Sequence, residues 1–248
     1  MEALAFAEAP QTFSERVSRL LEKVDYRLAL DDDDRDEIYR LRYEAYLHEG
    51  AIGPSFSRRF QDKFDDKDNT WTYGFYIDGE LVSSIRIHIA TSAIPDMPAL
   101  LSFPEILEPE LDAGKVIIDP TRFVIDRRAS RIYPELRYVV VRLPFIACEF
   151  FGADLLLATV RTEHQAFYRR VFGHELIAQA RPYPTLVKPL SLMSLDYLAS
   201  RDRVQQRYPF FRSTFFERRM LFDVAAAMLP SHPVEIGPIR AEESVEAV

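Results

Sequence analysis

The sequence predicts an α/β (α+β) fold, in which a central mixed β-sheet is flanked by helices and extra helices are added at both ends. Strand-like and helix-like segments alternate along the 248 residues, as they do in layered domains. Asp78-Gly79 lies between two apolar runs and is a strong β-hairpin signal. Hydrophobic residues make up 48% of the chain, which is ample for a sizeable core.

The first half of the chain contains two expected helices and three expected strands. Four successive aspartates, Asp31 to Asp34, predict a helix start, because acidic side chains cap free amides and face the positive end of the helix dipole. Gly50 and Gly53-Pro54 end that helix. The expected elements are a helix over 13–23, a strand over 24–30, a helix over 31–47, a loop over 54–70, and strands over 71–77 and 81–89.

The second half predicts the remainder of the sheet and its covering helices. Pro120 interrupts an apolar strand, and because proline lacks an amide donor we expect this strand to bulge or to separate from a neighbour there. Gly152 closes a long helix that Pro144 kinks. The expected elements are an irregular segment over 94–115, a strand over 116–125, helices over 135–151 and 162–172, strands over 155–160, 174–180 and 186–195, and helical structure over 196–229.

Charge and cysteine content exclude several classes of protein. The net charge of −8 and the pI near 5.3 argue against nucleic-acid binding, which requires a basic surface. Cys148 is the only cysteine and His88 and His164 are isolated, so we expect no disulfide and no metal site. The sequence has no signal peptide and no apolar run long enough for a membrane helix, which favours a cytoplasmic protein.

Two sets of segments resemble known families. The order of elements, together with FYRRVFGHEL (167–176), resembles the GNAT acyltransferase fold. Five segments then occur in the order and spacing of the acyl-homoserine-lactone (autoinducer) synthases and their relatives, the N-acyl amino acid synthases. They are LRYEAYL, FDDKDNTWTY, SSIRI, FPEIL and IDPTRFVID. The resemblance implies a GNAT-like core over 24–196, helical extensions over 1–23 and 197–230, and a flexible tail over 231–248.

The resemblance also implies the residues of a site. Asp119 and Arg122 match an acidic-x-x-Arg pair, in which Asp119 is the candidate catalytic base, although a purely structural ion pair fits the two residues equally well. The positions that match substrate-binding residues are Arg42, Tyr46, Asp65, Asp68, Arg86 and Phe103. The aspartates could instead order their loop, and the arginines could bind either these aspartates or a substrate carboxylate.

Two departures separate the chain from the lactone synthases. Asp119 stands where they have Glu, and Ala51-Ile52 stands where they have a tryptophan. The resemblance therefore implies an N-acyltransferase that moves a long-chain fatty acyl group from an acyl-carrier-protein thioester to the amino group of an amino acid. The alternatives are a lactone synthase using S-adenosylmethionine and a non-catalytic GNAT-like protein that binds acyl carriers or lipids.

The expected donor is an acyl-phosphopantetheine thioester, with no tightly bound cofactor. GNAT proteins that use coenzyme A carry a glycine-rich turn after the fourth strand, whereas DRRASRIYPELR at 126–137 contains no glycine. Arginines are crowded here instead, and they suit the phosphate of a carrier arm and an acidic carrier surface. They are Arg127, Arg128, Arg131, Arg137 and Arg142. A solvated basic helix end is the alternative.

Overall fold

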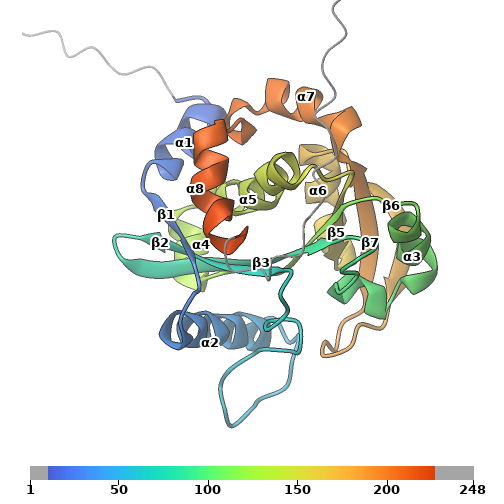
Figure 1. Cartoon of the computed structure of the whole chain (residues 1–248). Helices are drawn as coiled ribbons and strands as arrows, with labels where there is room; N and C mark the ends of the chain where they lie inside the picture. Colours follow the sequence, from blue (N-terminus) through green and yellow to red (C-terminus); the bar gives the residue numbers. More distant parts are fainter. Residues whose placement is uncertain (1–10, 227–248) are drawn as a thin grey trace, which may run out of the picture.

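Seven strands form one mixed sheet in the order β1-β2-β3-β4-β5-β7-β6 (Figure 1). The computed structural model describes residues 11–226. Neighbouring strands are antiparallel except β4 and β5, which are parallel. The strands are β1 (Val24–Leu28), β2 (Thr70–Ile77), β3 (Glu80–Ala90), β4 (Ile117–Ile125), β5 (Leu155–Val160), β6 (Glu175–Arg181) and β7 (Leu190–Asp196).

Helices cover both faces of the sheet (Figure 1). The helices are α1 (Phe13–Leu21), α2 (Asp32–His48), η1 (Pro98–Leu101), α3 (Pro104–Asp112), α4 (Arg127–Ile132), α5 (Leu136–Phe151), η2 (Thr162–His164), α6 (Gln165–Val171), α7 (Tyr197–Arg207), η3 (Pro209–Phe211) and α8 (Phe215–Ala226). The main core lies between the sheet and α5, with α1 and α8 beside α5, and α2 lies on the opposite face. No helix in the described range is long and apolar enough to cross a membrane.

The helix starts follow the local sequence. Asp31 caps α2, and its carboxylate accepts a hydrogen bond from the Asp34 amide at 2.8 Å. Thr12 and Glu15 form a reciprocal capping box at the start of α1. The hairpin turn between β2 and β3 has positive φ at both Asp78 and Gly79, as a two-residue type I′ turn requires.

β4 separates from β5 shortly after the two strands meet. They pair only at Ile117 with Leu155 and at Ile118 with Leu156, so the pairing ends two residues before Pro120. A bulge follows, because three steps along β4 match two steps along β3, and Arg122 within it has a φ of 54°. The interruption expected at Pro120 is therefore present as a separation from β5 and a bulge against β3.

Two segments differ from the expectation, and parts of both ends lie outside the described residues. The stretch 94–115 is not irregular throughout, because Pro104 occupies the first turn of α3, where its fixed φ favours a helix. A short helix, α4, occupies the arginine-rich segment after β4. Up to residue 226, the helical structure expected over 196–229 consists of α7, η3 and α8. Residues 1–10 of the N-terminal extension, the end of the C-terminal extension and the tail over 231–248 lie outside the described residues.

Candidate active site

A buried cluster of charged side chains joins the loop before β2 to helix α2 and strands β3 and β4. Asp62 accepts two hydrogen bonds from Arg86, at 2.8 and 3.2 Å, and one from Nη2 of Arg122. Asp65 accepts a 2.7 Å bond from Nη1 of Arg42 and lies 2.9 Å from Nη1 of Arg86. The loop carboxylates thus hold one guanidinium from each of three elements.

The bulge in β4 explains why these side chains meet. Side chains alternate between faces along a strand, so Ile85 points toward α5 while Arg86 points toward α2. Arg122 would face away from Thr121 in a regular strand. Its positive φ breaks the alternation, and both residues contact the cluster, where the Thr121 hydroxyl accepts a 3.1 Å bond from Nε of Arg86.

The cluster carries an excess of positive charge. Burial disfavours ionisation of Asp62, but hydrogen bonds and charge from Arg86 and Arg122 outweigh it and hold the pKa of Asp62 well below its usual range. The pKa of Asp65 is also lowered, because the charges of Arg42 and Arg86 outweigh its burial. Two carboxylates therefore face three guanidiniums. Nε and Nη2 of Arg42 and Nε of Arg122 have no hydrogen-bond partner among the described residues.

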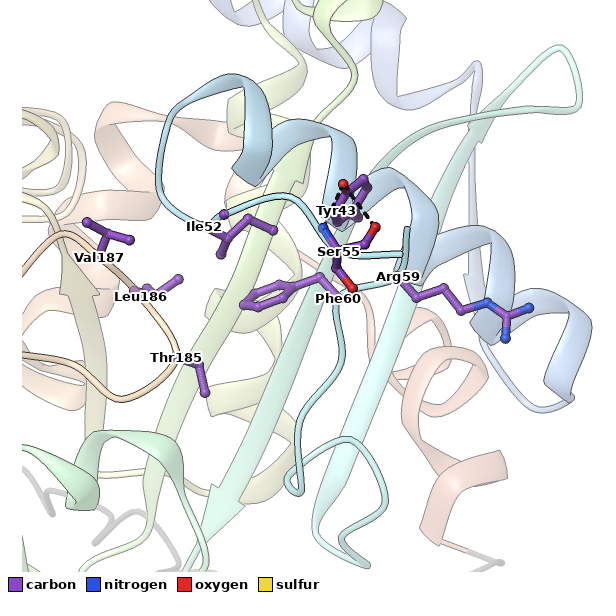
Figure 2. Close-up of a pocket in the computed structure, with 9 residues that line it drawn as sticks. Tyr43, Ile52, Ser55, Arg59, Phe60, Thr185, Leu186 and Val187 are labelled. Atoms are coloured by element: carbon purple, nitrogen blue, oxygen red, sulfur yellow. Dashed lines mark hydrogen bonds between the residues drawn. The ribbon is translucent and has the colours of Figure 1, made fainter. Parts of the chain in front are cut away.

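A pocket of about 440 Å³ lies beside this cluster, between α2, the loop after it and the β6–β7 connection (Figure 2). Phe60 and Thr185 belong to its wall and also contact Arg122, whose guanidinium lies 4.5 Å from the Phe60 ring centroid and 3.1 Å from the Thr185 hydroxyl. Figure 2 shows Arg59 pointing away from the pocket. The lining residues are Tyr43, Ile52, Gly53, Ser55, Arg59, Phe60, Thr185, Leu186 and Val187. We call it the α2 pocket.

A second, smaller cavity lies on the other face of the sheet where β4 and β5 separate. Its volume is about 20 Å³, and we call it the β4–β5 cavity. Pro120 and Phe123 face it from β4, on either side of the two residues that face the charged cluster. The other lining residues are Ile85, Val141, Pro144, Leu156, Leu157, Tyr168, Phe172 and His174. β4 therefore separates a polar, arginine-rich site from an apolar cavity.

Asp119 is fully buried on β4 and lines neither of these spaces. Its Oδ2 accepts a 3.0 Å hydrogen bond from the Ala99 amide, while Oδ1 has no partner among the described residues. Burial raises the pKa of Asp119 to about 7, although the bond from Ala99 and the charge of Arg86 oppose the shift. Arg122 pairs with Asp62, so the structural Asp119–Arg122 pair is wrong.

The other expected substrate residues are divided between the cluster and its surroundings. The Tyr46 ring lies 5.0 Å from the Phe60 ring, tilted by 49°, and 5.7 Å from the Arg122 guanidinium, next to the cluster. Phe103 is buried in a separate core beneath α3. Asp68 is exposed, and no hydrogen bond or ion pair involves its side chain in the described structure, so it does not join the cluster.

The resemblance matches Asp65 and Asp68 to the Asp-x-x-Asp pair, whereas the aspartates that bind the arginines in the structure are Asp62 and Asp65. The loop contains aspartates at 62, 65, 66 and 68, so Asp62 with Asp65 has the same spacing as Asp65 with Asp68. The structure brings the first pair together on the arginines and leaves Asp68 in solvent. The spacing alone could have indicated Asp62, but nothing in the loop sequence distinguishes the two registers.

The arginine-rich segment is exposed except at its end. Arg127, Arg128, Arg131 and Arg137 are solvent-exposed on α4 and the start of α5. Arg142 is buried, and its guanidinium binds Glu217 of α8 and the carbonyls of Phe210 and Arg212, so it is not part of the exposed group. Across the described part of the chain, no three His, Cys, Asp or Glu side chains gather as ligands for a metal ion.

The mixed sheet, with β4 separated from β5, has the GNAT-like α/β architecture expected from the sequence. The comparisons with known proteins agree. The family model "N-acyl amino acid synthase FeeM" matches residues 37–196, and the chain belongs to this family. No curated protein sequence matches the chain.

Solved structures show the same fold at low sequence identity. FeeM, an N-acyl amino acid synthase from uncultured soil microbes, is 19% identical with a TM-score of 0.60, over 83% of this chain and 98% of that one. TofI, solved with an inhibitor and MTA, is 14% identical with a TM-score of 0.55, over 77% and 100%. The acyl-homoserine lactone synthase BjaI is 15% identical with a TM-score of 0.54, over 75% and 89%.

Proposed function

We propose that the protein transfers a long-chain fatty acyl group from the thioester of an acyl carrier protein to the amino group of an amino acid. One observation carries the proposal: at the bulge, β4 presents Pro120 and Phe123 to an apolar cavity and Thr121 and Arg122 to a cationic cluster. An acyl donor suits the first environment and an amino-acid carboxylate suits the second. The reacting atoms meet at the edge of β4 that β5 leaves open.

The excess of cationic groups supports an acceptor that carries a carboxylate. A buried positive charge without a counter-ion is costly, and a carboxylate accepted by guanidinium groups relieves that cost. Arg122 forms the boundary between the cluster and the α2 pocket, through Phe60 and Thr185. The carboxylate of the acceptor amino acid binds near Arg122, and the side chain of the acceptor occupies the α2 pocket.

The chemistry requires few protein groups, because a thioester is already activated. The amine attacks the carbonyl, a C–N bond forms, the C–S bond breaks and the carrier leaves as a thiolate, which takes up a proton from solvent. Beyond Ile118 the open edge of β4 has no β5 partner, and its backbone amides stabilise the developing oxyanion. Asp119, with a pKa of about 7, takes the amine proton through a water molecule.

The segment after β4 supports a carrier protein as the donor. The Asp126 carboxylate accepts hydrogen bonds from the amides of Arg128 and Ala129, both at 2.8 Å, so these helix-start amides are not available to a pyrophosphate. The exposed arginines of α4 have no carboxylate partner in the described structure and face solvent. They suit one phosphate on a carrier arm and an acidic carrier surface.

The test is an acylation assay with fatty acyl-carrier thioesters of several chain lengths and a mixture of amino acids, with products identified by mass. We expect N-acyl amino acids and an equal amount of free carrier thiol. Each amino acid that reacts is then compared with its decarboxylated amine, which should react at least 100-fold more slowly. Absence of product at every chain length contradicts the proposal. A lactone that forms only after S-adenosylmethionine is added would identify an acyl-homoserine-lactone synthase instead.

A further inference from the structure

The outer side of α8 carries a group of exposed apolar side chains. Phe215, Phe216 and Met220 have relative exposures of 67%, 72% and 63%, and we call them the α8 patch. Residues about one turn apart on a helix lie on the same side, so these three side chains and Arg219 share one side of α8. The other large apolar side chains that are exposed in the described part of the chain lie one to an element or loop.

The inner side of α8 is apolar as well and is anchored to the rest of the fold. Phe222 is fully buried in the main core. The Leu221 carbonyl accepts a 2.6 Å hydrogen bond from the Tyr73 hydroxyl, and Glu217 accepts two bonds from Arg142 of α5. Because these contacts hold the inner side, the α8 patch stays turned to the outside. A helix that is apolar on both sides is normally covered on both, so the α8 patch indicates a surface that binds here.

The charge around the α8 patch is positive, although the whole chain has a net charge of −8. Arg219 is exposed, and its guanidinium lies 5.8 Å from the centroid of the Phe215 ring. Arg212 is exposed just before the helix, and Arg218 is half-buried within it. Of the two carboxylates of α8, one is bound to α5 and the other, Asp223, pairs with Arg219. This part of the molecule therefore presents more positive than negative charge, and an anionic surface complements it.

A lipid membrane with anionic headgroups matches both properties of the α8 patch. Helices that lie in a membrane interface insert aromatic and other apolar side chains among the headgroups, while their basic side chains bind the anionic lipids. A second copy of the chain fits less well. In a two-fold dimer the same patch lies on both sides of the interface, so the arginines of one copy would face those of the other.

We propose that α8 binds the surface of an anionic membrane, with Phe215, Phe216 and Met220 inserted among the headgroups and with Arg212 and Arg219 on the lipid phosphates. The inference does not depend on the proposed function. The residues of α8 line neither the α2 pocket nor the β4–β5 cavity, so the membrane surface and the candidate active site are separate.

The experiment sediments the full-length protein with vesicles made of equal parts of phosphatidylcholine and phosphatidylglycerol, and with vesicles of phosphatidylcholine alone. We expect the wild type to bind the anionic vesicles roughly tenfold more tightly, with binding that weakens as salt is added. Phe215→Ser with Phe216→Ser should lower the partition into both kinds of vesicle by roughly tenfold, because two phenyl rings no longer enter the lipid. Arg212→Gln with Arg219→Gln should weaken binding to the anionic vesicles alone.

Phe56→Ser with Leu198→Ser is the matched control, because it removes two exposed apolar side chains from other surfaces. This variant should bind both kinds of vesicle as the wild type does. All the substituted side chains are exposed, so the melting temperatures of the variants should stay close to that of the wild type.

A fluorescent probe gives an independent readout. Trp71 is the only tryptophan and is buried, so Phe216→Trp adds one exposed indole. The emission of this variant should shift to shorter wavelength when anionic vesicles are added, whereas that of Leu198→Trp should not.

Two results would overturn the inference directly: no binding of the wild type to the anionic vesicles, or equal binding by the wild type and by Phe215→Ser with Phe216→Ser. A dimer in solution that this double variant dissociates would overturn it too, because it assigns the α8 patch to a second copy of the chain. Each of these results leaves the proposed function intact, since the acylation assay tests that function separately.

Discussion

Asp62 and Arg86 are joined by two hydrogen bonds, and the same carboxylate also holds Arg122. One loop residue therefore fixes the relative positions of β3 and the bulged part of β4. Asp65 extends the arrangement to Arg42 on α2. The loop over 54–70 is thus a structural part of the site, although it contains no helix or strand before β2.

Replacing Asp62 tests this relationship. Asp62→Asn leaves two buried guanidiniums without their shared counter-charge, so the free energy of unfolding should fall by about 3–5 kcal/mol at pH 7. Asp68→Asn is the same substitution six positions later in an exposed residue, and it should change stability by less than about 0.5 kcal/mol. Urea unfolding of both variants measures the difference. Equal effects would show that the cluster does not depend on Asp62.

The Asp62 carboxylate should also make the free energy of unfolding depend on pH. The pKa of Asp62 is depressed in the folded protein, so its contribution is present above its unfolded pKa, near 4, and is lost as the pH falls. The stability difference between wild type and Asp62→Asn should therefore shrink below pH 4. A difference that stays constant between pH 7 and pH 3 contradicts this account.

Asp119 should control the pH dependence of the reaction. If its ionised form accepts the proton, kcat/KM rises with pH through an inflection near 7. Asp119→Asn should lower kcat/KM by at least about 100-fold and remove that inflection. An inflection near 7 that persists in the variant assigns the titration to another group.

The raised pKa of Asp119 also predicts an effect on stability with the opposite sign to that of Asp62. Between its unfolded pKa, near 4, and its folded pKa of about 7, the folded state binds more protons than the unfolded state. Wild-type stability therefore falls, relative to Asp119→Asn, as the pH rises through this range. The melting temperature of Asp119→Asn relative to that of the wild type should therefore be higher at pH 8 than at pH 5.

The exposed arginines of α4 should affect carrier donors alone. Arg128→Ala with Arg131→Ala is expected to lower kcat/KM for an acyl-carrier donor about tenfold, with a weaker salt dependence, and to leave a small acyl-thioester donor unaffected. The control is Arg218→Ala with Arg219→Ala on α8, which removes two charges from another helix. A similar loss in both double variants would argue against a docking role for α4.

The α2 pocket should govern the acceptor. Leu186→Trp fills part of the pocket, so KM for the amino acid should rise severalfold while KM for the acyl donor stays unchanged. Leu198→Trp places the same side chain at an exposed position of α7 and serves as the control. A rise in KM for the donor instead would place the acyl chain in the α2 pocket.

The sequence predicted the elements whose local signals agree with their environment. The aspartates before α2, the Asp78-Gly79 turn and Gly152 after α5 all lie where their conformational preferences put them. Helix α3 differs from the expectation, because its two prolines indicate irregular structure although Pro104 lies in the first turn of the helix. The interruption at Pro120 was predicted, but the positive φ at Arg122, which turns that side chain onto Asp62, has no signal in the residue type.

The site residues also divide into those that the sequence indicates and those that only the fold shows. The resemblance points to four residues that lie in one cluster, namely Arg42, Arg86, Arg122 and Asp65. The sequence gives no signal for Asp62, Phe60 and Thr185, because their contacts depend on how two loops pack beside β4, which is a tertiary property. His174 follows a helix end in the sequence, and only the fold shows that it faces the space between β4 and β5.

The most direct test of the central claim is a crystal structure with a non-hydrolysable acyl-pantetheine analogue, in which an amide replaces the thioester. The account predicts density for the arm between β4 and β5, with the acyl carbonyl beside the open edge of β4 at Pro120. Density confined to the α2 pocket, with none in the space between β4 and β5, would contradict the account.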